Sequence, residues 1–371
     1  MRFPLAFLFL TSHTSAAPPT YVGVWTAPPN ALPSGQLPDV PLTGNGQLGL
    51  LLDSRAAPLP PSPPPSGAQS LSVWFSSNDM WSCRAPPPAA QVTGRCGKVA
   101  LGGLTVTLPP FLRFSNFTQA LASGSLSSAW VTPTGGVLTS TTRLHPSSPV
   151  ATTALTWAPG AGDPPTLSLN ATTWVREATS AHGSPAPAAV FCAGAGGAPT
   201  PCASPAAAVF GASRVASSGA SAYEPLARWA ALATALAGGG GVIAQAGAAL
   251  TPSGAAWGAT FAFPLGAGGA ALVTAEAEAG SYAAGADPAP AAAALALATA
   301  AAPGAVAAAS DAFWAGFFAR SAVALPPPYL QELYDGAAYI LGCTASRRSE
   351  VAPPGLYGVW ATSDDCNWNG D

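Results

Sequence analysis

The stretches Leu71-Ser-Val-Trp-Phe75 and Leu104-Thr-Val-Thr-Leu108 decide the fold class of this chain. Apolar side chains recur at every second position in both, which is the pattern of a β-strand with one buried face. Comparable runs occur at 151–157 and 167–174, and clusters of Gly, Pro and Ser separate all of them. Many short strands divided by turn-forming residues predict a mainly β protein built as an antiparallel β-sandwich. We expect this domain to cover residues 18–286.

The character of the sequence changes from strand to helix after Asp287. An alanine-dense segment, 291–302, is interrupted by Pro303-Gly304, and 305–320 resumes the helical pattern. Ser310 is a plausible N-cap for the second of these helices, ahead of an apolar face formed by four aromatic residues: Phe313, Trp314, Phe317 and Phe318. A further helix begins near Pro326–Pro328 and ends near Gly342-Cys343. We expect residues 287–322 to form a helical linker.

The composition excludes two classes of partner. Of the 371 residues only 8% are charged, the formal net charge is −3, and Lys98 is the sole lysine. Nucleic acids and anionic membranes both require a basic footprint, which this sequence lacks. We therefore predict no nucleic-acid partner and no membrane partner. The oligomeric state is not determined by the sequence.

The N-terminus has the pattern of a secretory signal peptide. Met1-Arg2 precedes an apolar run over 3–10, and mostly small residues follow over 12–17. This arrangement predicts removal of residues 1–17 and a secreted or endomembrane-lumen location. The alternative is a short buried strand, for which no preceding segment offers a partner. The run is too short to span a bilayer, since about 20 apolar residues are needed.

The cysteines and sequons fit an oxidising compartment. Six cysteines form three sequence-local pairs, which suits disulfides closing small loops: Cys83 with Cys96, Cys192 with Cys202, and Cys343 with Cys366. Sequence alone leaves 15 connectivities open. Zinc is the weaker alternative because no pair has CxxC spacing, so we expect no metal. Asn116 and Asn170 begin sequons and are predicted glycosylation sites.

Two segments of low complexity are expected to be loops. Residues 57–66 are mostly proline, which lacks the N–H that a sheet ladder needs, so they are predicted to form an exposed polyproline II insertion. Residues 180–221 are rich in Ala, Gly, Pro and Ser. We predict a long loop there, pinned by the pair at Cys192.

Familiar catalytic and cofactor motifs are missing from the sequence. Residues 44–49 fit the GxGxxG string, but no buried strand precedes them and a strand-like run follows, so a tight turn is the expected structure and no cofactor is predicted. The GxSxG, HExxH and Walker motifs do not occur. Glu276 and Glu278 would share one face of a strand and could form an acid/base couple, although solvent-facing strand residues explain them equally well.

Two distant segments together resemble a family of secreted glycosidases. Near the N-terminus these are Trp25, Leu37-Pro-Asp-Val-Pro-Leu-Thr-Gly-Asn-Gly-Gln-Leu-Gly49 and Phe75-Ser-Ser-Asn-Asp-Met-Trp81. They resemble the opening of the β-sandwich in glycoside hydrolase family 95, the alpha-L-fucosidase type within the six-hairpin glycosidase superfamily. Thr43 departs from the family pattern, in which Leu is usually followed directly by Gly, and this indicates a divergent branch.

The C-terminal segments extend the resemblance. Residues 313–321, 329–343, 355–360 and 367–371 resemble the family's linker helix, first barrel helix and first active-site loop. The resemblance implies that 323–371 begin an (α/α)6 barrel, incomplete here, and that the chain is the N-terminal part of a glycoside hydrolase. The family's catalytic residues lie beyond the position of Asp371, so the resemblance assigns none here and implies no activity for this chain alone.

The same resemblance suggests residues for an oligosaccharide or polysaccharide partner. Trp360 and Trp368 would stack on pyranose faces, and Asn367 and Asp371 would hydrogen-bond hydroxyl groups. A place in the core is the alternative for both tryptophans. Asp79 would approach the barrel opening from the sandwich side, or else belong to a structural turn.

A rival from another class is a non-catalytic, secreted carbohydrate-binding or cell-wall-associated β-sandwich glycoprotein. In either case a lone first barrel helix would expose the face that carries Leu333 and Leu341. We therefore expect a disordered or aggregation-prone tail from about Leu325.

Overall fold

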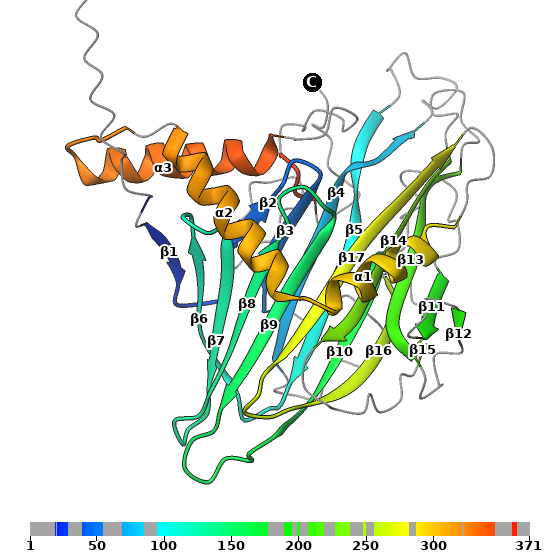
Figure 1. Cartoon of the computed structure of the whole chain (residues 1–371), viewed down its shortest axis with the longest axis horizontal. Helices are drawn as coiled ribbons and strands as arrows, with labels where there is room; N and C mark the ends of the chain where they lie inside the picture. Colours follow the sequence, from blue (N-terminus) through cyan, green and yellow to red (C-terminus); the bar gives the residue numbers. More distant parts are fainter. Residues whose placement is uncertain are drawn as a thin grey trace, which may run out of the picture.

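Strands occupy the first three quarters of the chain and helices the rest (Figure 1). The structure is a computed structural model, and it describes residues 19, 21–28, 39–54, 69–84, 95–176, 189–194, 199–200, 207–218, 227–237, 248–249, 256–281, 287–320, 323–345 and 358–361. The mainly β architecture predicted from the alternating runs is confirmed. Residues 1–17 and 57–66 lie outside the described residues, so the signal peptide and the polyproline insertion stay predictions.

Two antiparallel sheets form the body of the described chain. The smaller has the order β15-β16-β10-β5-β4-β3-β2. Its strands are β2 Leu42–Gly44, β3 Leu48–Asp53, β4 Gln69–Arg84, β5 Arg95–Leu108, β10 Leu167–Arg176, β15 Ala248–Ala249 and β16 Ala256–Leu265. Strands β4 and β5 contain the alternating runs 71–75 and 104–108. They pair in antiparallel register, with Val73 opposite Leu104.

The larger sheet has the order β1-β6-β7-β8-β9-β17-β14-β13-β11-β12. Its strands are β1 Val22–Trp25, β6 Arg113–Ala120, β7 Ser125–Val131, β8 Val137–Leu144, β9 Val150–Ala158, β11 Ala189–Gly194, β12 Pro199–Thr200, β13 Ala207–Ser218, β14 Ala227–Ala237 and β17 Ala270–Ser281. Three of these strands correct the prediction of a long loop over 180–221. Apolar pairs such as Val190-Phe191 and Val209-Phe210 give the segment the buried faces that a strand needs.

One hydrophobic core is shared by the two sheets. Phe75 and Val106 enter it from the smaller sheet, and Trp130 and Leu232 enter it from the larger one. The opposite face of β4 and β5 is also buried. There the hydroxyl groups of Ser72 and Thr105 lie 2.9 Å apart and hydrogen-bond to each other, which compensates for their removal from water.

In the part of the chain that the structure describes, three helices follow the last strand: α1 Ala289–Ala300, α2 Gly304–Arg320 and α3 Pro328–Thr344. α1 packs on the outer face of β14 and β17, where Ala231, Ala233 and Ala235 alternate with the core residues of β14. Small side chains on both surfaces allow this close approach. Ser310 lies inside α2 and donates to the carbonyl of Ser123 over 3.0 Å, so the predicted N-cap is wrong.

No single described helix is long and apolar enough to cross a bilayer. α1 and α2 meet that test only when taken together, and they are bent by 87° at the break between them.

α3 corrects the expectation of disorder from Leu325, because a helix is formed and one of its faces is docked. Tyr339 and Cys343 are buried. The expected exposure of its other face is confirmed for Leu333 and Leu341, which are 65% and 67% exposed, whereas Tyr334 and Ala338, expected on the same face, are half-buried.

Candidate functional site

The turn between β2 and β3 is the centre of the region to which the family resemblance points. Asn45 Oδ1 accepts hydrogen bonds from the backbone N–H groups of Gln47 (3.0 Å) and Leu48 (2.8 Å). Its Nδ2 donates to the carbonyl of His145 over 2.9 Å. Gly46 has φ 84°, which favours glycine. The expectation of a tight turn feeding a strand is therefore confirmed, and the turn is tied to the end of β8.

The C-terminal end of α3 docks on this turn. The N–H of Gly46 donates to the carbonyl of Cys343 over 2.7 Å, and the hydroxyl of Tyr339 donates to the carbonyl of Leu42 over 3.0 Å. A side chain at Gly44 would place its Cβ 2.7 Å from the Cys343 carbonyl oxygen, so the contact requires glycine. Burial, and secondarily the Cys343 thiol, raises the pKa of Tyr339 well above its ordinary value. Tyr339 therefore stays neutral and acts as a hydrogen-bond donor.

Residues 358–361 pack against the same turn from a third direction. Ser76 donates its hydroxyl to the carbonyl of Val359 over 2.5 Å, and the indole N–H of Trp360 donates to the carbonyl of Thr43 over 2.8 Å. Gly49 leaves room for this segment, because a Cβ there would lie 2.6 Å from Trp360 Cδ1. We call the assembly of the 44–49 turn, the end of α3 and residues 358–361 the junction.

Trp360 corrects one predicted sugar contact. Its ring is only 4% exposed and belongs to a buried cluster with Trp74, Trp314 and Tyr339. The indole N–H is already used by Thr43. The core alternative therefore describes this residue, because a ring covered by protein on both faces has none left for a pyranose.

The other predicted sugar contacts remain predictions. Asn367, Trp368 and Asp371 lie outside the described residues. Asp79 lies in an irregular part of β4, where pairing with β5 is interrupted between Ser76 and Trp81, and its side chain is not described. A strand therefore replaces the structural turn expected there. The neighbouring N–H of Asn78 donates to the carbonyl of Gln47 over 2.7 Å, which places this backbone beside the junction.

The described backbone bears on two of the three predicted cysteine pairs. Cys83 and Cys96 are directly opposite each other in the register of β4 and β5, a separation that suits a disulfide. Cys192 is disulfide-bonded, and it pairs across the β11–β12 hairpin with Thr200, two residues before Cys202. Cys202 and Cys366 lie outside the described residues. The Cys192–Cys202 pairing stays a prediction. Cys343 is a buried thiol, so the predicted disulfide from this residue is not formed in the structure.

The two sequons occupy different environments. Asn170 is exposed on β10, where a glycan would point into solvent. Asn116 is half-buried on β6, at an irregularity in its pairing with β7. Both positions are strands rather than loops.

No acid/base pair is assembled at the junction by the described residues. Its described polar groups are a phenol, an indole, a hydroxyl, a thiol, the side-chain amides of Asn45 and Gln47, and backbone amides. Glu276, considered as half of a carboxylate pair, is 1% exposed on β17 in the larger sheet. Its predicted position on a solvent face is therefore wrong. Within the described ranges no cluster of His, Cys, Asp or Glu side chains could hold a metal ion.

Sequence reasoning missed Ser76 and Tyr339 as contacts of the junction. The alternating pattern of β4 marks Ser76 as a polar-face residue, and helical spacing marks Tyr339 as one of several apolar positions. Neither signal reveals a partner that is hundreds of residues away. The glycines at 44 and 49 leave room for these partners, which only the structure reveals.

Comparisons with known proteins yielded distant structural likenesses, and no match by sequence. No protein-family model matches the chain, and no curated protein matches it. Among solved structures it is similar to "Putative kojibiose phosphorylase from human microbiome", with 8% sequence identity and a TM-score of 0.48. The alignment covers 82% of this chain and 39% of that chain, so this chain spans about two fifths of the length of that protein. A likeness at this level carries no functional inference, which has to come from the chain's own residues and contacts.

Proposed function

We propose that this chain is the N-terminal, β-rich part of a secreted carbohydrate-active hydrolase of the fucosidase type. In this proposal the two sheets form a sandwich that supports an (α/α)6 catalytic barrel, and α3 is the first barrel helix. The substrate is an oligosaccharide or polysaccharide. Catalytic groups are supplied by the rest of the barrel, so the chain by itself has no hydrolytic activity.

The two-sided character of α3 is the observation that carries the proposal. One side is fixed to the junction through Tyr339 and Cys343. The other presents a stripe of apolar residues, with Tyr329, Leu333 and Leu341 64%, 65% and 67% exposed. Burying one such side chain contributes about 1.5–3 kcal/mol. Neighbouring helices of an α/α barrel would provide that burial while leaving the junction side untouched.

The junction also explains how a sandwich would serve a sugar site. Residues 358–361 are held by Ser76 and Thr43 just before the segment in which the resemblance places Asn367, Trp368 and Asp371. Because residues 358–361 are held in place, fewer conformations are open to the loop that follows them. This lowers the entropy cost of ordering that loop around a ligand. The exposed Asn170 is compatible with glycosylation in a secretory compartment.

The experiment that tests this proposal begins with the transcript. We would sequence it through its 3′ end, then express both the protein it encodes and the present chain, and assay each against a panel of aryl glycosides. We expect turnover of at least one glycoside by the longer protein and none by the present chain. A stop codon directly after Asp371, or a longer protein that binds sugars without cleaving them, would favour the non-catalytic carbohydrate-binding protein instead.

A further inference from the structure

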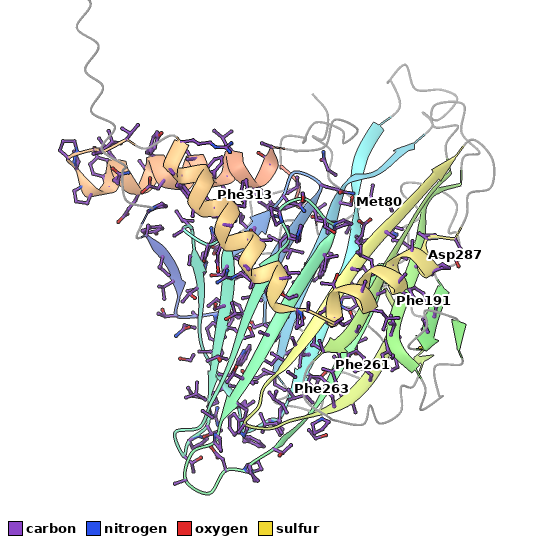
Figure 2. The ribbon with its side chains drawn as sticks, viewed as in Figure 1. Met80, Phe191, Phe261, Phe263, Asp287 and Phe313 are labelled. Carbon is purple, nitrogen blue, oxygen red and sulfur yellow. The ribbon has the colours of Figure 1, made fainter. Side chains whose placement is uncertain are left out.

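A pocket lies between the beginning of α1 and strand β11, on the face of the larger sheet that points away from the shared core (Figure 2). Its volume is about 110 Å³, and it opens to solvent. It is lined by Phe191, Cys192, Ala193, Asp287, Ala289, Pro290 and Ala293. A closed cavity of about 150 Å³ holds benzene in another protein, so an open pocket of this size accommodates a single ring or a short alkyl chain.

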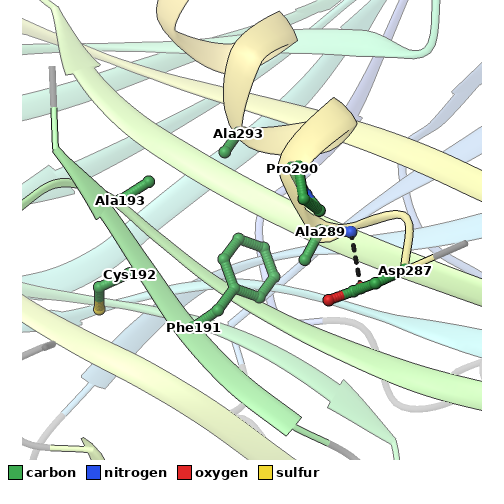
Figure 3. A pocket seen from close by; sticks show the side chains of 7 residues that line it. All are labelled: Phe191, Cys192, Ala193, Asp287, Ala289, Pro290 and Ala293. Atoms are coloured by element: carbon green, nitrogen blue, oxygen red, sulfur yellow. Dashed lines mark hydrogen bonds between the residues drawn. The ribbon is translucent and has the colours of Figure 1, made fainter. Parts of the chain in front are cut away.

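Phe191 lines the pocket, and the neighbouring strand β13 holds its ring in place. The ring lies against the backbone of Gly211 on the neighbouring strand β13, so closely that no side chain fits at position 211. Figure 3 shows the ring between β11 and the first turn of α1, with Asp287 beside it. The far end of the ring is therefore packed against β13, while the half-buried side chain remains accessible from the pocket.

Among the described lining residues, one carries a charge. Asp287 Oδ1 accepts a hydrogen bond from the N–H of Ala289 over 2.9 Å, drawn as the dashed line in Figure 3. The start of a helix carries about half a positive charge, which offsets only part of the carboxylate's full negative charge. No Lys, Arg or His is among the described lining residues. The pocket is therefore apolar in its walls and negative at its mouth.

We propose that this pocket binds a small organic cation with an apolar body, such as an aryl- or alkylammonium ion. The apolar part would fill the space between Phe191, Ala193 and Ala293, and the ammonium would lie between the Phe191 ring and the carboxylate of Asp287. Cations are attracted to the face of an aromatic ring, and a carboxylate adds a charge-assisted hydrogen bond. A sugar fits this pocket poorly, because its many hydroxyl groups would need hydrogen-bond partners. Among the described lining residues, Asp287 is the only one with a charged side chain.

The test compares three ligands of similar shape and different charge on the whole chain. Benzylamine is a cation at neutral pH, benzyl alcohol is neutral, and phenylacetate is an anion. Binding would be measured by calorimetry and by saturation-transfer NMR. We expect benzylamine to bind about tenfold more tightly than benzyl alcohol, and phenylacetate more weakly than either. We also expect about 0.5 M NaCl to weaken benzylamine binding without affecting benzyl alcohol.

Variants identify the residues responsible. Asp287→Asn keeps an oxygen for the Ala289 N–H but removes the charge, so it is expected to reduce benzylamine affinity to that of benzyl alcohol. Phe191→Leu should weaken both ligands. Asp39→Asn, at an exposed aspartate away from the lining, is the matched control and should change neither. Three results would each overturn the proposal: absence of benzylamine binding, equal affinity for benzylamine and benzyl alcohol, or full benzylamine affinity in Asp287→Asn. None of these results bears on the glycosidase proposal.

Discussion

The indole N–H of Trp360 donates to the carbonyl oxygen of Thr43 over 2.8 Å, across 317 residues of sequence. Both groups are buried, and the indole N–H is removed from water and satisfied by this bond. This bond joins the chain after α3 to the turn between β2 and β3, and it makes the junction a single packed unit.

Trp360→Phe keeps an aromatic ring in the cluster but removes the donor to Thr43. We expect a loss of about 0.5–1.5 kcal/mol in the free energy of unfolding, because one buried hydrogen bond to the Thr43 carbonyl is removed. Chemical denaturation of the purified chain measures this. Trp25→Phe, at a half-buried tryptophan on β1, is the matched control and should cost less. Equal losses in the two variants would mean that ring volume, not the hydrogen bond, is what matters.

Gly49→Ala is expected to destabilise the chain by about 1–3 kcal/mol through overpacking. The added methyl group would lie 2.6 Å from Trp360 Cδ1 and 2.7 Å from the Val359 carbonyl oxygen. Gly268→Ala is the control, since no atom lies within 4 Å of a Cβ at that position. Thermal unfolding of both variants checks the prediction, which fails if Gly49→Ala has the same Tm as the parent chain.

Charged substitutions on the exposed face of α3 should leave the stability of this chain nearly unchanged. Leu333→Glu and Leu341→Glu alter side chains that are about two thirds exposed, and surface changes of this kind usually stay within about 0.5 kcal/mol. Self-association should decrease because the apolar stripe is interrupted, and light scattering measures this change. In a barrel-containing protein of the proposed kind, the same variants should destabilise the fold, because α3 would be covered there.

Acid should weaken the loop contacts around Asp163. Hydrogen bonds from Thr134 first, and then from Thr132 and the N–H of Gly160, lower the pKa of this carboxyl below its ordinary value. A lowered folded-state pKa gives stability that is fully present above the ordinary value of about 4 and is lost as pH falls through the folded value. Asp163→Asn should flatten the dependence of stability on pH below about 4. An unchanged slope in that variant would remove Asp163 as its source.

His145 should add a second pH dependence at milder acidity. Burial lowers the pKa of its imidazole, so the folded state favours the neutral ring. Stability associated with this residue is therefore present above the ordinary value of about 6.5 and declines as pH falls through the lowered folded value. His145→Gln should remove this component. The denaturation midpoint would be measured for both proteins at several values between about pH 7 and pH 5. The midpoint of the parent chain should fall more steeply with decreasing pH than that of His145→Gln.

Local patterns were sufficient for most strands and for the helical C-terminal part. Leu71, Val73 and Phe75 all enter the shared core, as their spacing predicted. The same reasoning failed for residues 180–221, where β11 and β13 replace an expected loop, because alanine-rich strands lack the contrast between faces that makes alternation visible. It also failed for Ser310, whose hydroxyl bonds to a distant carbonyl instead of capping α2.

Sequence by itself determined that the chain is mainly β with a helical end, that residues 44–49 form a tight turn, and that one face of α3 is apolar and exposed. These properties depend on spacing and on residues near one another along the chain. Tertiary structure alone decided that Trp360 is buried, that Ser76 and Tyr339 hold the junction, and that Phe191 and Asp287 meet beside α1. Each of those contacts joins segments far apart in sequence, and their partners are selected by how the two sheets and the helices pack rather than by any local preference.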